Sequence, residues 1–405
     1  MSDATAEVSR VARASSLAQT LAAATLIQIV ATTSVLALTA IAPSVAADLG
    51  IGAHWIGYQI SLIYAAGMFS SAVAGTLVQR FGPVKIEQTA LICFTVGFAG
   101  VASALIPLII LASLLIGIGY GLNNPASSEM LSRITPHKKR NIVFSLKQTG
   151  VPLGGILASF AFPFLSGLFG WHLALLIAAA APLLTMGLLA ATHAAEPAMV
   201  RKLPSFRKGF IDEQSTIWKS RRLRVLSGLG FAYSAMQLSV SAFAVVALVH
   251  DARWSLLSAG SVAAVMQFCG AFGRIFWGAI ADRIGGGFLT LGLLGLMSGL
   301  GFLALYWLHD LPTFLQAGLF ILLGFVSIGW NGVLLAEVAH NAPESRVGAI
   351  TGGALVYTFI GVIVGPSTFA MIYELAGHYG ASFLFFSLFG FAGTATAWKV
   401  HFQKG

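Results

Sequence analysis

Long apolar stretches, separated by short groups of charged residues, prolines and glycines, run along almost the whole chain. A transmembrane helix needs about 20 consecutive, mostly apolar residues to cross the hydrocarbon core of a bilayer. Twelve stretches meet this requirement, at 19–47, 55–78, 84–104, 107–133, 141–166, 171–192, 222–249, 255–280, 287–308, 313–340, 347–373 and 380–400. The pattern therefore predicts an all-α membrane protein with twelve transmembrane helices.

Composition excludes the main alternative classes of protein. The 405 residues are 57% apolar and only 9% charged, with 45 glycines and a mean hydropathy of +0.86. A soluble domain has about 25% charged residues, and disordered or nucleic-acid-binding chains are more polar still. The two cysteines, Cys93 and Cys269, lie in apolar stretches, so no disulfide scaffold is expected. The first apolar stretch is too long for a cleavable signal peptide.

The distribution of basic residues predicts the orientation in the membrane. Of the 23 Lys and Arg residues, twenty fall in segments on the side of the chain termini and Arg253 alone falls on the other side, while Lys147 and Arg274 lie within spans. Cytoplasmic loops carry the excess of Lys and Arg in membrane proteins. We therefore expect a multi-pass protein of the bacterial cytoplasmic membrane with both termini in the cytoplasm. The net charge of +9 is a topology signal on this interpretation, and it implies no nucleic-acid partner.

One long basic segment divides the spans six from six. The predicted organisation is an N-terminal six-helix bundle at 1–192, a cytoplasmic linker loop at 193–221 and a C-terminal six-helix bundle at 222–405. The halves also repeat each other at a slowly drifting offset, in the pairs Gly75/Gly278, Gln79/Asp282, Arg80/Arg283, Gly82/Gly285, Asn123/Asn331, Glu129/Glu337, Gly150/Gly361 and Gly154/Gly365. A parallel duplication of this kind places a pathway between the halves, near the membrane midplane.

The segment Gly278-Ala-Ile-Ala-Asp282-Arg283-Ile-Gly285 resembles the loop signature of the major facilitator superfamily. Together with the twelve spans, the linker and the repeat, the resemblance covers essentially the whole chain. It implies two pseudo-symmetric six-helix bundles that rock around a central site. The first copy of the signature has Gln79 where the family usually has Asp.

Two further segments resemble particular branches of that superfamily. Ser145-Leu-Lys147-Gln148-Thr149-Gly150-Val-Pro152-Leu-Gly154-Gly155 is similar to permeases of the cyanate-permease branch. Gly273-Arg274-Ile-Phe-Trp-Gly278 resembles the monocarboxylate and oxalate/formate porters, which implies that Arg274 binds a substrate carboxylate. Those porters often carry an Asp one turn earlier, where this chain has Gly270.

Two cationic side chains lie within the predicted spans. An ionisable residue in the membrane is costly and indicates function by default, and here the candidates are Lys147 and Arg274. No Asp or Glu is expected at a comparable depth, because Asp48, Glu129, Glu337 and Glu374 fall near span ends. A bound anion would stabilise two buried cations, so a small anionic substrate is predicted. In the alternative interpretation both side chains extend to the cytoplasmic surface.

Uncharged polar residues on the helices expected around the pathway are further candidates for substrate binding. They could orient a substrate by hydrogen bonds in an otherwise apolar cleft, or they could only bond neighbouring helices to each other. These candidates are Gln28, Tyr120, Asn123, Asn124, Gln148, Tyr233, Gln237, Gln267, Trp330 and Asn331.

Charged residues at the inner ends of the spans are candidates for a cytoplasmic gate. We expect contacts between Arg80 and Glu129 and between Arg283 and Glu337, with Asp282 near the positive helix N-terminus around Arg140 and Asn141. The alternative is that these residues are separate, solvated charges that contribute little to the stability of the closed state.

The sequence therefore predicts a secondary active transporter, a symporter or antiporter, which moves a small, carboxylate-like organic anion by alternating access. A proton or a counter-anion is a possible coupling partner, lipid surrounds a protein expected to be a monomer, and no cofactor, metal site or enzymatic activity is predicted. The same-class alternative is a proton-coupled exporter of drugs or amphiphiles, disfavoured by Gln79 and by the absence of a membrane acid. A non-transporting sensor or a membrane enzyme is the alternative from a different class.

Overall fold

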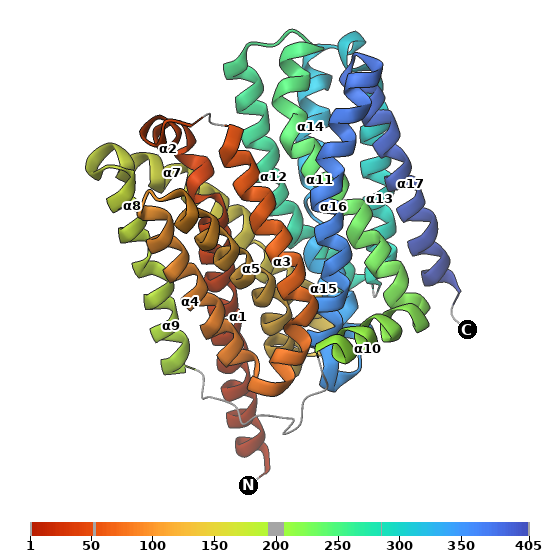
Figure 1. Ribbon diagram of the computed structural model, residues 1–405. Helices are drawn as coiled ribbons and strands as arrows, with labels where there is room; N and C mark the ends of the chain where they lie inside the picture. The colour runs from red at the N-terminus through yellow and green to blue at the C-terminus, as the bar shows by residue number, and fades with distance from the viewer. Residues whose placement is uncertain (1, 52–53, 193–205, 285, 404–405) are drawn as a thin grey trace.

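The computed structural model of the protein describes residues 2–51, 54–192, 206–284 and 286–403, and all regular structure in these ranges is helical (Figure 1). Twelve helical spans within them are long and apolar enough to cross a membrane. The predicted fold class is therefore confirmed. Gly285, the last residue of the second loop signature, and residues 193–205 of the linker lie outside the described residues.

The N-terminal half contains nine α-helices and one 3-10 turn. These are α1 (Ser2–Ala40), α2 (Ala42–Leu49), α3 (His54–Phe81), α4 (Pro83–Ala102), α5 (Ile106–Ile134), η1 (His137–Lys139), α6 (Arg140–Gln148), α7 (Gly150–Phe169), α8 (Trp171–Ala178) and α9 (Ala180–Thr192). Helices α6 and α7 together form the fifth span, and α8 and α9 form the sixth.

The C-terminal half repeats the arrangement after a separate linker helix, α10 (Phe206–Lys219). Its elements are α11 (Arg221–His250), α12 (Leu256–Arg283), α13 (Gly287–Ala304), η2 (Leu305–Asp310), α14 (Thr313–Ser327), α15 (Asn331–Asn341), η3 (Glu344–Arg346), α16 (Val347–Ala376) and α17 (Tyr379–Phe402). The tenth span is interrupted between α14 and α15, next to Trp330.

Two segments differ from the sequence-based expectation. The first span ends at Ala40 instead of residue 47, because Ile41 has a non-helical backbone (φ −121°, ψ 20°) and the chain restarts as the short helix α2. The linker, expected to be a loop, forms α10 over its described part. Ile217 of α10 is fully buried, and its neighbours include Gly353 of α16, so α10 packs on the bundle. Burial of the apolar face of α10 against the bundle therefore stabilises the helical conformation of this part of the linker.

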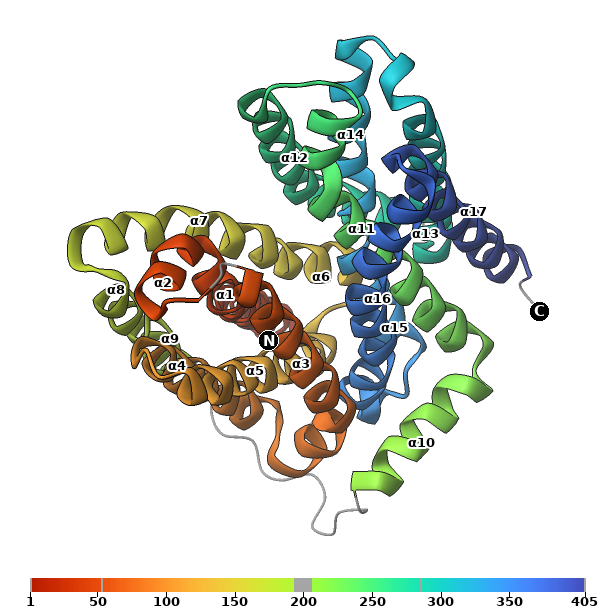
Figure 2. The same cartoon turned by 45° about the horizontal axis from the view of Figure 1, so that its top comes forward.

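Each half has its own apolar core, and the halves meet mainly at one end. We call the end marked by Arg80, Arg133, Arg283 and Arg346 the basic end, and the other the opposite end. Helix α6 packs against α12 and α15, while α3 and α5 pack against α16. A third apolar cluster, which includes Phe144, Leu335 and Phe359, joins the halves there. Figure 2 shows α6 and α16 at this junction, with the two halves diverging from it.

Candidate functional site

Five of the predicted polar residues form one buried network in the N-terminal half. The Lys147 ammonium, in the last turn of α6, donates to Oε1 of Gln28 (2.8 Å) and to Oδ1 of Asn124. Asn123 Nδ2 donates to the same Gln28 oxygen (3.0 Å), and Gln148 Nε2 donates to Asn124 Oδ1 (3.1 Å). Lys147 is only 2% exposed. Neutral amide oxygens thus hold the ammonium in place without cancelling its charge.

Arg274 reaches this network from the other half. It lies on α12, is 1% exposed, and its Nη1 donates to the backbone oxygen of Gln148 at the end of α6 (2.8 Å). Its Nε is buried and has no hydrogen-bond partner among the described residues. The guanidinium therefore points across the junction between the halves and keeps donor capacity unused. Neither Arg274 nor Lys147 extends to an aqueous surface, which is contrary to the alternative interpretation.

Two aromatic side chains that the sequence did not single out, Tyr64 and Phe359, pack around the predicted residue Tyr120 beside these cations. The rings of Tyr64 and Tyr120 meet edge to face with centroids 5.8 Å apart, and Phe359 of α16 lies 6.2 Å from the Tyr120 ring. Arg274 interacts electrostatically with both Tyr120 and Lys147. We call Tyr64, Tyr120 and Phe359 the aromatic cluster. It places π-faces from both halves next to the charged centre, as no single-helix pattern could reveal.

Glu87 is a buried acid that the sequence analysis did not single out, near the start of the third span. It is fully buried on α4, and both carboxylate oxygens lack a hydrogen-bond partner among the described residues. The Glu87 and Lys147 charges interact electrostatically. Sequence reasoning missed this residue because it stands only one turn from the start of its span. Its neighbours on the same helical face, Ala90, Leu91 and Phe94, are as apolar as the rest of the span.

The predicted polar residues of the C-terminal half are less closely connected. Trp330 Nε1 donates to Oε1 of Gln237 (2.9 Å) near the break in the tenth span. Tyr233 donates to the backbone oxygen of Leu291 (2.7 Å), which makes it a bond between helices of one half. Gln267 is exposed and Asn331 is partly buried; neither joins the Lys147 network. The polar site is therefore asymmetric between the halves.

The carboxylate of Asp282 lies where we expected it. Its Oδ1 accepts from the backbone N–H of Asn141 (3.1 Å) and from Nδ2 of Asn141 (2.8 Å), and its Oδ2 accepts from the backbone N–H of Ile142 (2.9 Å). An acidic group from the C-terminal half thus caps the N-terminus of α6, where the helix dipole favours negative charge. Arg140 donates to the backbone oxygen of Ala339 (3.2 Å) at the same contact.

Glu129 makes the reciprocal contact. Its Oε2 accepts from the backbone N–H of Gly348 (2.6 Å) in the first turn of α16, and its Oε1 pairs with Arg133 of its own helix (3.1 Å). Glu337 bonds to His340 (3.3 Å) within α15.

The expected ion pairs Arg80–Glu129 and Arg283–Glu337 are not present among the described residues. The reason is that each carboxylate has nearer donors than the exposed guanidinium at the helix end.

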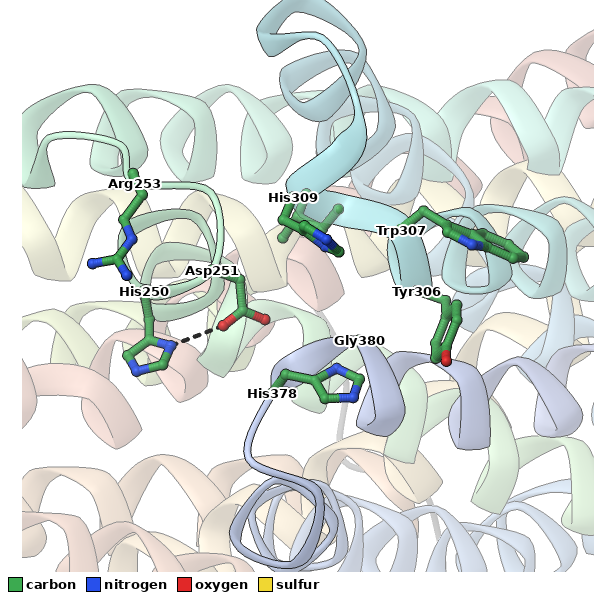
Figure 3. Close-up of a pocket in the computed structure, with 9 residues that line it drawn as sticks. His250, Asp251, Arg253, Tyr306, Trp307, His309, His378 and Gly380 are labelled. Carbon is green, nitrogen blue, oxygen red and sulfur yellow. Dashed lines mark hydrogen bonds and ion pairs between the residues drawn. The ribbon is translucent and has the colours of Figure 1, made fainter.

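A cavity of about 450 Å³ lies at the opposite end of the C-terminal half (Figure 3). Its lining comes from the turns that join the spans there, and includes Arg253, Trp307 and three histidines, with His250 hydrogen-bonded to Asp251 (2.8 Å). None of the predicted substrate-binding residues lines it. In the described part of the chain no group of three acidic, His or Cys side chains could hold a metal ion.

Comparisons with known proteins agree with this architecture. The putative niacin/nicotinamide transporter NiaP of Bacillus subtilis is 25% identical over 348 residues, which are 83% of this chain and 82% of that protein. The benzoate transport protein of Acinetobacter baylyi is 24% identical over 387 residues, covering 86% and 82%. The structure of the human organic anion transporter MFSD10 has a TM-score of 0.76 at 16% identity, covering 94% of this chain and 99% of that one.

The family model for the Major Facilitator Superfamily matches residues 24–366, most of the chain. The match includes both buried cations, the aromatic cluster and both caps at the basic end. This multi-pass membrane protein therefore belongs to the major facilitator superfamily of transporters.

Proposed function

We propose that the protein transports a small organic anion, in particular an aromatic monocarboxylate, across the bacterial cytoplasmic membrane by alternating access. One observation carries this proposal: the buried guanidinium of Arg274, with its Nε unpartnered, stands at the junction of the halves beside Lys147. A buried donor without an acceptor costs free energy that a bound acceptor would recover.

A carboxylate fits this centre better than a cation or a neutral solute. The planar guanidinium can donate two parallel hydrogen bonds to a carboxylate, and Lys147 adds a point charge that attracts the same group. The amide oxygens of Gln28 and Asn124 hold that ammonium, with no acid in direct contact among the described residues. A positively charged substrate would be repelled by Arg274 and Lys147.

The aromatic cluster supports an aromatic substrate body. Tyr64, Tyr120 and Phe359 present edges and faces of the kind on which a planar ring packs favourably. The names of two relatives support an aromatic body, since niacin, nicotinamide and benzoate each contain one ring; niacin and benzoate also carry a carboxylate, whereas nicotinamide carries an amide. For the remaining candidates, Gln237, Gln267, Trp330 and Asn331, we propose contacts with the far side of the substrate.

The contacts between the halves define the state that we infer. With both termini in the cytoplasm, as the positive-inside pattern indicates, the basic end is the cytoplasmic end. The caps by Asp282 and Glu129 then close the cytoplasmic side, so the substrate site is reached from outside. We propose that Asp282, Glu129, Arg140, Arg80, Arg283 and Glu337 form the cytoplasmic gate of a monomeric carrier.

A proton-coupled exporter of drugs is the second candidate within the same class. The presence of Glu87 removes one argument against it, because the membrane region does hold an acid. Two buried cations at the junction still disfavour a cationic or amphiphilic drug. A sensor or a membrane enzyme has no specific support from the described residues.

Uptake by purified protein in proteoliposomes tests the proposal. Radiolabelled benzoate and niacin should enter and should exchange with unlabelled benzoate inside, while tetraphenylphosphonium should not. A protein inactive with every carboxylate but active with the lipophilic cation would contradict the proposal.

A further inference from the structure

We propose that a second cavity, between the two halves at the basic end, binds a phosphate-type oxyanion and that the bound oxyanion stabilises the closed basic end and slows transport. The cavity has a volume of about 600 Å³, and none of the residues that line it belongs to the centre around Arg274 and Lys147. Its ligand is therefore an effector and not the transported substrate. With the orientation proposed above, this effector comes from the cytoplasm.

Both halves contribute to the walls of this cavity. One wall comes from the end of α5, η1 and the start of α6, and the other from the end of α15, η3 and the start of α16. The exposed lining residues Arg133, His137 and Glu344 open the cavity to solvent, whereas Thr135 and Arg140 are only 5% and 6% exposed. Because each half supplies one wall, the complete cavity exists only while the halves are in contact at the basic end. A ligand that contacts both walls therefore favours that closed state.

Two buried polar atoms of the lining have no hydrogen-bond partner among the described residues. Arg140 donates from Nη1 to the backbone oxygen of Ala339 (3.2 Å) and from Nη2 to that of Ser132 (3.0 Å), but its Nε is unpartnered. The Thr135 hydroxyl is also unpartnered, although the backbone N–H of Thr135 bonds to Leu131 (3.0 Å). Buried polar groups are nearly always hydrogen-bonded. A ligand oxygen that accepts from both atoms would recover the free energy that their burial costs.

The positive charge of Arg140 also has no anion in direct contact. Backbone carbonyl oxygens, one from each half, hold its Nη atoms, and it forms no ion pair among the described residues. Glu344 interacts with Arg140 electrostatically, but Glu344 is exposed, so water screens its charge. A buried charge without a partner is costly. An oxyanion at Arg140 would offset that cost through charge-assisted hydrogen bonds.

A pair of histidines adds positive charge to the lining. The rings of His137 and His340 stack across the junction, with centroids 5.8 Å apart and an interplanar angle of 16°. His340 Nε2 lies 3.1 Å from the backbone oxygen of His137, and its Nδ1 lies 3.3 Å from Oε1 of Glu337. Only the doubly protonated ring donates to both oxygens, and that form is cationic. Each half thus presents at least one cation to the cavity.

The arrangement of the donors favours phosphate over a carboxylate. Arg140, Thr135 and His137 belong to different elements, so their donor atoms approach a ligand from different directions. A phosphate group offers three strong acceptor oxygens, whereas a carboxylate offers two in one plane. The cavity volume is also typical of small-molecule sites. Inorganic phosphate, a phosphorylated metabolite and the headgroup of an anionic lipid share the required chemistry.

Calorimetry with sodium phosphate, against sodium chloride of equal ionic strength, is the first test. The wild-type protein in neutral detergent should bind phosphate. Thr135→Val removes the hydroxyl but keeps the side-chain shape, and should bind phosphate about 10-fold more weakly. Glu344→Gln removes a negative charge at the mouth of the cavity and should bind it about 2- to 5-fold more tightly. Because these two shifts have opposite signs, a general loss of folding does not reproduce them.

Each variant has a matched control. Thr396 is an exposed threonine whose hydroxyl bonds only within α17, and Glu374 is an exposed glutamate at the opposite end of α16. Thr396→Val and Glu374→Gln should bind phosphate with the wild-type affinity.

Conformation and transport provide the second test. In phosphatidylcholine proteoliposomes, phosphate on the side of the basic end should slow the labelling of an α6 cysteine severalfold and inhibit benzoate exchange. The inhibition, relative to the exchange of each variant without phosphate, should be largely lost in Thr135→Val. Adding phosphatidylglycerol distinguishes the sources of the ligand. Slower labelling with this lipid alone would assign the site to a lipid headgroup, and slower labelling only with phosphate would assign it to a soluble oxyanion.

The possible failures are distinguishable. If the wild-type protein binds no phosphate and phosphatidylglycerol does not slow labelling, or if Thr135→Val and Glu344→Gln both keep the wild-type affinity, the effector site is refuted and the anion carrier is not affected. Phosphate binding with faster labelling of α6 refutes its role in closure. Absence of exchange for every carboxylate tested refutes the proposed function, while calorimetry and labelling still decide whether the effector site exists.

Discussion

The two ends of the molecule are held in different ways. At the basic end, each half presents a carboxylate to a helix N-terminus of the other half: Asp282 caps α6, and Glu129 caps α16. At the opposite end, the described acids bond within their own half, as Asp251 does with the backbone N–H of Tyr379 (2.8 Å) and Asp48 with Trp171 (3.1 Å). A few reciprocal polar contacts therefore hold the two halves together at the basic end, and these contacts can break at the same time.

Close backbone approach adds to those contacts. Ser145 of α6 lies between Gly278 of α12 and Gly332 of α15, and a Cβ atom at either glycine would overlap it. The absence of side chains there lets α6 settle between two helices of the other half. Contact between the halves at the basic end thus depends on close helix packing as well as on charge.

The largest loss of transport activity is expected when the close approach of α6 to α15 is blocked. Gly332→Leu should prevent α6 from seating on α15, because the overlap involves the Ser145 backbone, which cannot rotate away. Overpacking of this kind costs about 3 kcal/mol or more, which shifts the balance between conformations by at least about 100-fold. Benzoate exchange in proteoliposomes should be nearly abolished, and cysteines placed on α6 should become reactive from the basic end.

Gly228→Leu is the matched control. Gly228 lies on α11, and a Cβ atom at this position would have no neighbouring atom within 4 Å, so the larger side chain meets open space. Its exchange activity should stay near the wild-type level. An equal loss of exchange activity in Gly332→Leu and Gly228→Leu would mean that the loss reflects reduced helix flexibility and not the contact between α6 and α15.

The second effect concerns the site between the two ends. Arg274→Lys keeps the charge but loses the planar pair of donors, so substrate binding should weaken by about 1.5–3 kcal/mol, or roughly 10- to 100-fold. Lys147→Arg should be tolerated better, since Lys147 acts as a point charge. Arg253→Lys, the same change at the exposed opposite end, should have no effect on the benzoate Kd from calorimetry. An unchanged Kd in Arg274→Lys would place the anion elsewhere.

A smaller effect should distinguish the Asp282 cap from an ordinary surface acid. Asp282→Asn removes the charge that interacts with the α6 dipole, which is worth up to about 2 kcal/mol in a partly buried site. The basic end should open more often, and labelling of an α6 cysteine should rise severalfold. Asp48→Asn, which breaks a contact within one half at the opposite end, should leave that labelling unchanged. A rise in both variants would argue against a specific cap.

The sequence was sufficient for the helices and for the burial of Lys147 and Arg274 within the spans, because length, apolarity and rare charges are properties of single spans. The repeat and the loop signature also located Asp282 correctly. The sequence did not reveal the buried Glu87, the packing of Tyr64 and Phe359 against Tyr120, or the cap by Glu129, since each depends on which faces of different helices meet. Every span here is apolar on most sides, so periodicity does not reveal the inward face. The predicted Arg80–Glu129 ion pair is not formed in this structure, in which Glu129 accepts from the backbone N–H of Gly348 and pairs with Arg133.

The linker helix α10 adds a further link at the basic end. Gln214 bridges the backbone oxygen of Gly353 (3.2 Å) and the hydroxyl of Tyr357 (2.8 Å), both on α16. Its neighbour Glu213 is 2% exposed, with one carboxylate oxygen unpartnered, beside Gly75 of α3. Helix α10 therefore spans the boundary between the halves and buries an acid in doing so.

The smallest effect is a pH dependence of this docking. Burial raises the pKa of Glu213 from 4.5 to about 8, although Arg346 opposes the shift and Asp212 adds to it. Because the docked form holds the proton more tightly than the undocked form, docking is strongest at low pH and weakens as pH rises toward about 8. Hydrogen exchange of the α10 amides, corrected for intrinsic rates, should therefore be faster at about pH 9 than at about pH 6. Glu213→Gln stays uncharged and should remove this difference; a pH dependence that persists in Glu213→Gln would assign it to another group.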